Sequence, residues 1–193
     1  VTALAPRSVH TRRNTPRVEN TLLVPGPASA DYMVNAVPHG TLSLQWYPSP
    51  TVNATRRAYV YTPPGYEHGT GRYPVLYLLH GGSGDEDAWN SCGRATQILD
   101  NLIAQGKARS MIVVMPNANT TRIAAPDLVP APPSLPAFRD PGRFPHFPDS
   151  LVHDLVPFID KTYRTLADRE HHAIAGLSVG AAQTTYTPVN HLV

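Results

Sequence analysis

The sequence predicts an α/β fold in which helices flank a mostly parallel sheet. Two short runs, 74–79 and 111–115, are apolar at every position, which is typical of strands that are covered on both faces. Residues 96–104, which lie between these runs, carry apolar side chains at helical spacing. Strands that alternate with helices build such a sheet through right-handed crossover connections.

An antiparallel hairpin is expected ahead of the parallel strands. Residues 41–47 and 56–62 both alternate between apolar and polar side chains, which indicates two half-buried strands. Residues 48–53 would connect them as a turn, and Pro63-Pro64-Gly65 would end the second strand.

Helix and strand alternate again toward the C-terminus. Residues 150–163 place apolar side chains on one helical face, with Asp149 or Ser150 as the N-cap. Pro157 is expected to kink or interrupt this helix. Residues 172–177 form a third short apolar strand.

Proline-rich segments divide the chain. Residues 1–30 lack periodicity and carry several prolines, so we expect a leader or interdomain linker before a single domain of residues 31–193. A second proline-rich stretch, between Ala118 and Asp149, separates two elements of the core. We expect it to form an ordered loop over the active site.

The composition argues against several classes of partner. The formal charge of +2 comes from scattered basic residues, so no nucleic-acid partner is expected. The apolar runs are too short to cross a bilayer, so no membrane partner is expected either. Cys92 is the single cysteine and allows no disulfide within the chain. No signal sequence opens the chain, which suggests a cytoplasmic protein or an exported one without its leader.

A candidate nucleophile lies in Gly176-Leu177-Ser178-Val179-Gly180, which fits the G-x-S-x-G pattern of the α/β-hydrolase elbow. In such an elbow the serine lies on a sharp turn between a strand and a helix. Both flanking residues are glycine because a side chain there would collide with the neighbouring strand and helix. We therefore expect Ser178 to be the nucleophile, with the Val179 amide directed at the oxyanion.

A second motif, His80-Gly81-Gly82-Ser83-Gly84, follows the first apolar run. An oxyanion hole needs a second amide, which comes from the loop after an early strand. Gly82 is the expected donor and Gly81 the second choice, whereas His80 is expected to hold the loop. Trp89 and Asn117, together with His80, are expected beside the substrate pocket.

Several longer motifs occur in a characteristic order. They are VPHG at 37–40, WYPSP at 46–50, YVYTPPGY at 59–66, YPVLYLLHGG at 73–82, VMPN at 114–117 and AIAGLS at 173–178. On these motifs, the chain from Asp31 to Val193 resembles the esterase family of feruloyl and acetylxylan esterases, with enterochelin esterases as wider relatives. The resemblance implies an α/β-hydrolase fold and a serine ester hydrolase that needs no metal or cofactor. It further implies a secreted or periplasmic location, with residues 1–30 as a linker from a preceding immunoglobulin-like domain.

The sequence departs from this family after the elbow. The family's catalytic acid and histidine follow the serine, but the 15 residues after Ser178 contain no Asp or Glu and one histidine, His191. A helix would place His191 about 15 to 20 Å from the Ser178 hydroxyl, whereas a base must come within about 3 Å. The upstream histidines His146, His153, His171 and His172 are expected to be structural or surface residues. We therefore expect a chain that is truncated after the elbow and lacks the last strands.

Three interpretations of function remain. The first is a hydrolase that removes feruloyl or acetyl groups from plant cell-wall polysaccharide through an acyl-enzyme. The second is a catalytically impaired or inactive fragment of such an esterase, or a binding module. The third is a general carboxylesterase, thioesterase or acyltransferase on the same elbow. In each case the strand at 172–177 would form an apolar sheet edge, so self-association is expected.

Overall fold

A computed structural model describes residues 10–14, 17–120 and 146–191. Most of the proline-rich loop that we expect over the active site, residues 121–145, lies outside the described residues. In the part of the chain that is described, no helix is both long enough and apolar enough to span a membrane.

The core of the fold is a five-stranded sheet with the order β3-β4-β6-β5-β7. Its strands are β3 (Thr41–Ser49), β4 (Ala54–Thr62), β5 (Val75–Leu79), β6 (Ile112–Pro116) and β7 (His172–Gly176). Strands β6, β5 and β7 are parallel, whereas β4 runs antiparallel to both β3 and β6. The structure thus confirms the mostly parallel sheet and its N-terminal antiparallel hairpin.

The hairpin connection is shorter than the predicted turn at 48–53. Pro48 and Ser49 still pair with Thr55 and Ala54, and only a 3-10 turn at Pro50–Val52 and the left-handed Asn53 connect the strands. Pro48 is tolerated because β3 lies at the sheet edge, where one side of the strand needs no donor.

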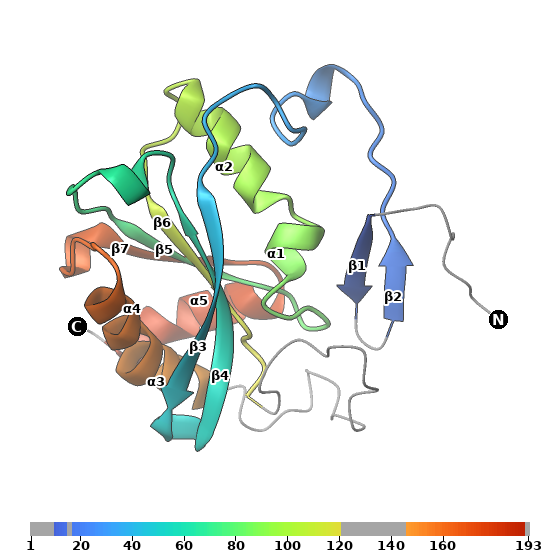
Figure 1. The fold of residues 1–193 in the computed structure, drawn as a ribbon. Coiled ribbons are helices and arrows are strands. Elements are labelled where there is room, and N and C mark those ends of the chain that lie inside the picture. The colour runs from blue at the N-terminus through green and yellow to red at the C-terminus, as the bar shows by residue number, and fades with distance from the viewer. Residues whose placement is uncertain (1–9, 15–16, 121–145, 192–193) are drawn as a thin grey trace.

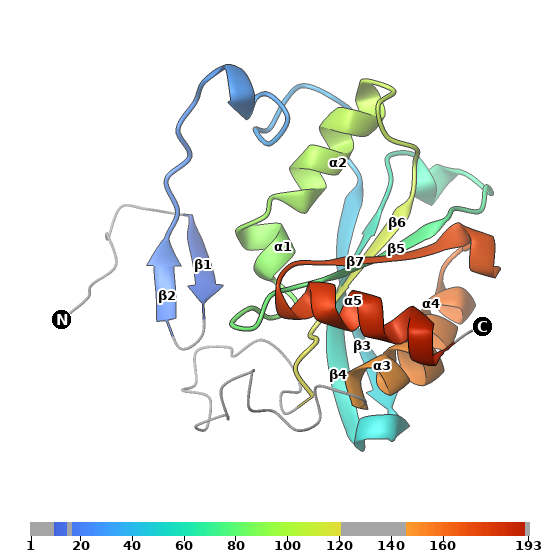
Figure 2. The same ribbon diagram turned by 180° about the vertical axis from the view of Figure 1, so that it is seen from behind.

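Helices cover both faces of the sheet (Figures 1 and 2). They are α1 (Ala88–Ser91), α2 (Ala95–Ala104), α3 (His146–Ser150), α4 (Val156–Thr162) and α5 (Val179–Asn190). Val75, Tyr77 and Leu79 of β5 pack in the core under α3 and α4, whereas Leu76 and Leu78 pack in the second core, toward α2. Because β5 is buried on both faces, its sequence is a continuous run of apolar residues.

The helix predicted over 150–163 is interrupted as expected. A π-helical turn at Leu151–Leu155 separates α3 from α4, and α4 starts at Val156. Pro157 is one of the first residues of α4 and directly follows this turn, so its missing N–H falls where the helical hydrogen-bond pattern changes from π to α.

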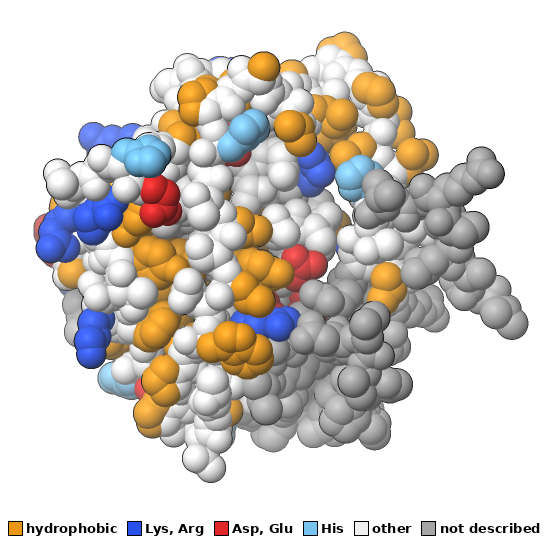
Figure 3. All heavy atoms as spheres, in the orientation of Figure 1, with side chains coloured by type: hydrophobic (Ala, Val, Ile, Leu, Met, Phe, Trp, Pro, Cys, Tyr) orange, Lys and Arg blue, Asp and Glu red, His pale blue; other side chains and the backbone are white. Residues whose placement is uncertain are grey.

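The N-terminal segment contains more structure than a linker requires. Strands β1 (Thr11–Asn14) and β2 (Arg17–Asn20) form a separate antiparallel hairpin that lies beside α1 (Figure 1). The segment that follows exposes Leu22, Val24 and Val34, and Figure 3 shows apolar atoms on this side of the molecule. The sequence did not predict this hairpin, because its short strands contain a single apolar residue, Val18, and so show no alternation.

Candidate active site

Ser178 lies at the turn between β7 and α5. Its backbone has φ 55° and ψ −112°, in the positive-φ region that residues other than glycine rarely adopt. Its side chain is exposed. A strained serine at the N-terminus of a helix is the local geometry that the G-x-S-x-G motif predicts.

Both flanking glycines are required by close backbone contacts. A Cβ atom on Gly176 would lie 2.4 Å from the carbonyl carbon of Gly180. A Cβ atom on Gly180 would lie 2.6 Å from the carbonyl oxygen of His80 and 2.7 Å from that of Leu79. The turn therefore packs against its own helix on one side and against the end of β5 on the other.

The glycine-rich loop after β5 lies next to the serine. A Cβ atom on Gly81 would be 3.7 Å from the Cβ of Ser178 and 3.6 Å from the carbonyl oxygen of Leu177. The Gly84 amide donates to the Gly81 carbonyl at 3.0 Å, which closes a tight turn. The structure thus brings together the two motifs that the sequence places nearly a hundred residues apart.

His80 sets the orientation of this loop. Its Nε2 atom accepts a hydrogen bond from the Ala118 amide at 2.9 Å, so its Nδ1 atom carries the proton and donates to the Gly81 carbonyl at 2.6 Å. In a trans peptide the N–H points opposite to the C=O, so the Gly82 amide points away from His80. Within the described residues, neither the Gly82 amide nor the Val179 amide has a hydrogen-bond partner.

The segment after β6 ties the loop to helix α5. The Ala118 carbonyl accepts a hydrogen bond from Nε2 of Gln183 at 3.2 Å, and Gln183 is completely buried. The guanidinium of Arg56, also completely buried, donates to the carbonyls of Asn117 and Asn119. Sequence reasoning missed Gln183 and Arg56, because their partners lie more than 60 residues away.

Asn117 does not line a substrate pocket, contrary to the sequence-based expectation. Its side chain is completely buried, its Nδ2 donates to Glu86 at 3.0 Å, and its Oδ1 accepts from the Asn119 amide at 3.0 Å. Glu86 in turn forms a buried ion pair with Arg57 at 2.7 Å. Asn117 is therefore part of the scaffold that holds the strand ends.

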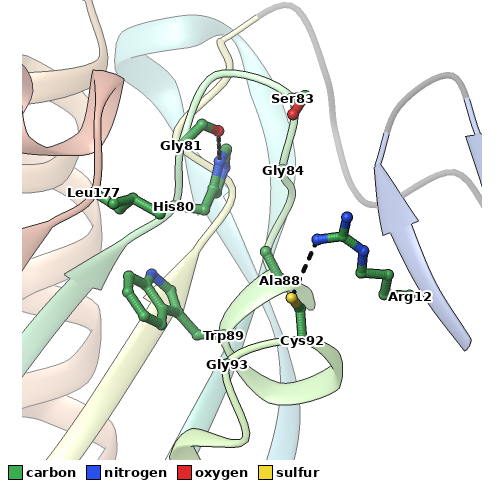
Figure 4. A pocket seen from close by; sticks show the side chains of 10 residues that line it. All are labelled: Arg12, His80, Gly81, Ser83, Gly84, Ala88, Trp89, Cys92, Gly93 and Leu177. Carbon is green, nitrogen blue, oxygen red and sulfur yellow. Dashed lines mark hydrogen bonds between the residues drawn. The ribbon is translucent and has the colours of Figure 1, made fainter. Parts of the chain in front are cut away.

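A cavity of about 280 Å³ opens beside the glycine-rich loop (Figure 4). It is lined by Arg12, His80, Gly81, Ser83, Gly84, Ala88, Trp89, Cys92, Gly93 and Leu177. Trp89 and His80, which are expected beside the substrate pocket, both line this cavity, although both polar atoms of the His80 ring face the protein. Leu177 connects the cavity to the nucleophile position, because it precedes Ser178.

Four of the described histidines pair with carboxylates away from the β7–α5 turn. These pairs are His39 with Asp100 at 2.9 Å, His171 with Asp168 at 2.6 Å, His172 with Asp160 at 3.2 Å and His191 with Asp149 at 3.1 Å. The hydrogen bond from His171 lowers the pKa of Asp168. His171 and His172 lie at the opposite end of β7 from Ser178, and His191 follows the far end of α5. Among the described residues, no cluster of three His, Cys, Asp or Glu side chains is arranged to hold a metal ion.

Comparison with known proteins shows which family the chain resembles. The model of the Esterase family, described as "Putative esterase", matches residues 49–191. A protein of Xylanibacter ruminicola named endo-1,4-beta-xylanase/feruloyl esterase is 36% identical over 152 residues, which cover 76% of this chain and 19% of that protein. Endo-1,4-beta-xylanase Y of Acetivibrio thermocellus is 26% identical over 177 residues, covering 86% of this chain and 14% of that protein.

Solved structures give the same result. The CE1 ferulic acid esterase of Anaeromyces mucronatus, in complex with ferulic acid, superposes with a TM-score of 0.69 and 26% identity, over 87% of this chain and 60% of that chain. The feruloyl esterase module of Clostridium thermocellum, complexed with sinapinate, shares the fold with a TM-score of 0.67 and 22% identity, over 96% of this chain and 56% of that chain. The chain thus spans less than two thirds of each of these relatives.

Proposed function

The chain belongs to the Esterase family of α/β-hydrolases, and on that premise we propose that it carries the nucleophile and oxyanion hole of a feruloyl esterase-type serine hydrolase. One observation carries this proposal. Ser178 is held at a positive φ by two glycines that backbone contacts require, beside a loop whose Gly82 amide has no hydrogen-bond partner among the described residues.

The proposed reaction proceeds through an acyl-enzyme. The Ser178 Oγ atom attacks the ester carbonyl and loses its proton, and the amides of Val179 and Gly82 hydrogen-bond the resulting oxyanion. Collapse of this intermediate breaks the ester C–O bond, and the alcohol leaves with a proton. Water then attacks the acyl-enzyme, which releases the carboxylic acid and restores the serine.

The serine also needs a base within about 3 Å. His80 does not fit this role, because its Nε2 accepts from Ala118 and its Nδ1 donates to Gly81. The paired histidines of β7 and of the end of α5 lie away from the turn. We therefore assign the base to no described residue. An oxyanion hole and substrate binding alone can still give about 10³- to 10⁴-fold acceleration over water.

The proposed substrates are feruloyl or acetyl esters of plant cell-wall polysaccharide. This choice follows the relatives, one of which is named a xylanase/feruloyl esterase and another of which is solved with ferulic acid. Because such polysaccharides are extracellular, we propose a secreted location. General carboxylesterase, thioesterase and acyltransferase chemistry would use the same elbow, and comparing methyl ferulate with p-nitrophenyl acetate separates feruloyl from general esterase activity.

A fluorophosphonate label tests the proposed nucleophile. The parent protein should be labelled, Ser178→Ala should not, and Ser110→Ala, ahead of β6 and at the opposite end of the sheet, should behave as the parent. Absence of labelling in the parent would instead favour the inactive fragment or binding module. Labelling that persists in Ser178→Ala would show that another residue reacts.

A further inference from the structure

We propose that the N-terminal hairpin β1–β2 completes a pocket for the aromatic ring of the acyl group, in which Arg12 binds a neutral oxygen substituent on that ring. This inference rests on the proposed function, since it names the ring-binding part of the same site. It concerns a segment that lies before the part of the chain matched by the family model, which begins at residue 49.

The cavity lies where the acyl group of a bound ester would extend. Leu177 and Gly81 line it, and both are immediate neighbours of Ser178 in space or sequence. Leu177 is 60% exposed, so its side chain is available for contact with a ligand. An acyl chain attached at Ser178 can therefore pass along Leu177 into the cavity.

The walls of the cavity suit a single aromatic ring. Trp89, Ala88 and Leu177 provide apolar surface, and Trp89 can stack against a ring or contact its edge. Its volume of about 280 Å³ lies near the lower end of small-molecule pockets, which begin at roughly 300 Å³. A substituted ring fits such a volume better than a polysaccharide chain does.

Arg12 closes the cavity from the side of the hairpin. Figure 4 shows its guanidinium reaching from β1 toward Cys92, with Nη1 at 3.2 Å from the Cys92 sulfur. A thiol sulfur is a weak hydrogen-bond acceptor, so a ligand oxygen that took its place would make a stronger hydrogen bond. Arg12 is thus a donor whose present partner is easily replaced.

The negative charge of Glu19 beside Arg12 determines which kind of ligand oxygen the guanidinium can bind. Its Nε and Nη2 atoms donate to Glu19 at 2.9 and 2.6 Å, so a carboxylate already lies against the guanidinium. A second carboxylate on the ligand would meet the negative charge of Glu19 at close range. A phenolic hydroxyl or methoxy oxygen meets no such repulsion, so the pocket favours an oxygenated but uncharged ring.

Isothermal titration calorimetry tests this pocket without turnover, in a Ser178→Ala background that leaves the ester intact. Methyl ferulate, which carries ring oxygens, should bind about tenfold more tightly than methyl cinnamate, which carries none. Arg12→Met, which keeps the apolar stem but removes the donors, should reduce this ratio to about one. The exposed Arg169→Met serves as the matched control and should keep the full ratio.

Three results would overturn the proposal. They are equal binding of the two esters in the Ser178→Ala protein, an unchanged ratio in Arg12→Met, and no binding of either ester. A further titration uses the monomethyl ester of terephthalic acid, whose ring carries a carboxylate. It should bind more weakly than methyl ferulate and gain affinity in Glu19→Gln, where the negative charge of Glu19 is removed. Fluorophosphonate labelling tests Ser178 separately, so failure of the nucleophile and failure of the ring pocket give different results.

Discussion

The Nε2 atom of His80 accepts a hydrogen bond from the amide of Ala118 at 2.9 Å. This bond joins the residue that follows β5 to the segment that follows β6. It also determines the tautomer of His80, so that Nδ1 donates to the Gly81 carbonyl and the next amide is directed away. The proposed oxyanion donor thus depends on a histidine that does not contact the reacting atoms.

Replacing His80 by alanine should mainly lower the reactivity of Ser178, with a smaller effect on the stability of the fold. Without the bond from Nδ1, the peptide between Gly81 and Gly82 can rotate, and loss of one oxyanion donor costs about 10²- to 10³-fold in rate. The measurement is the second-order rate of fluorophosphonate labelling. Gln183→Leu, which breaks only the contact to the Ala118 carbonyl, should stay within about tenfold of the parent. Equal rates for parent and His80→Ala would show that the loop needs no such support.

Gly180→Ala should strongly destabilise the fold. The new Cβ atom would lie 2.6 Å from the His80 carbonyl oxygen, which belongs to backbone that cannot move freely. We expect a loss of about 3 kcal/mol or more in the free energy of unfolding, measured by urea denaturation. Gly26→Ala is the matched control, since nothing lies within 4 Å of a Cβ atom there, and it should leave stability unchanged. Similar unfolding midpoints for both variants would contradict the close packing of the elbow.

The elbow and the sheet were predictable because their signals are local. The apolar runs of β5 and β6 and the G-x-S-x-G motif around Ser178 are each contained in a few consecutive residues. The role of Asn117 was not predictable, because an amide side chain at a strand end can point into a pocket or into the core. Here Glu86 and the Asn119 amide hold it in the core, and Glu86 lies 31 residues away.

The N-terminal hairpin was missed for a different reason. Its strands are four residues long and contain only one apolar residue, Val18, so they lack the apolar alternation by which a strand is recognised. Its position depends on long-range contacts such as the one between Arg12 and Cys92, which are 80 residues apart. No pattern in a single sequence indicates such a pair.

Tyr77→Phe and Tyr61→Phe should change stability in different ways. The Tyr77 hydroxyl is buried without a hydrogen-bond partner among the described residues, so removing it should be neutral or stabilising by up to about 1 kcal/mol. The Tyr61 hydroxyl donates to Asp100 at 2.7 Å, and its removal should cost about 1.5 to 3 kcal/mol. Urea denaturation at neutral pH measures both. A larger loss of stability for Tyr77→Phe than for Tyr61→Phe would contradict the assignment of a hydrogen bond to the Tyr61 hydroxyl and of none to the Tyr77 hydroxyl.

The fold should lose stability at alkaline pH. Burial raises the pKa of Tyr61 and Tyr77, and burial also raises the pKa of Tyr163 to about 12. Unfolded tyrosines ionise near pH 10, so below that pH both states are neutral and stability is constant. Above about pH 10 only the unfolded state releases these protons, and stability should fall as the pH rises toward the folded values. Unfolding curves between pH 8 and pH 11 measure this slope, which Tyr77→Phe should reduce.

The edge strand β7 should cause the polypeptide of 193 residues to self-associate. Among the described residues β7 pairs only with β5, so its other edge presents unpaired backbone groups to a second chain. Ala173 is exposed on this strand, and Ala173→Lys should weaken association because a charged side chain at an edge opposes strand pairing.

Sedimentation velocity at increasing concentration should show a rising average mass for the parent and a smaller rise for Ala173→Lys. Lys161, an exposed residue of α4, provides a control as Lys161→Ala, which should associate as the parent does. A parent that remains a single monomeric species at high concentration would show that this edge is protected in solution.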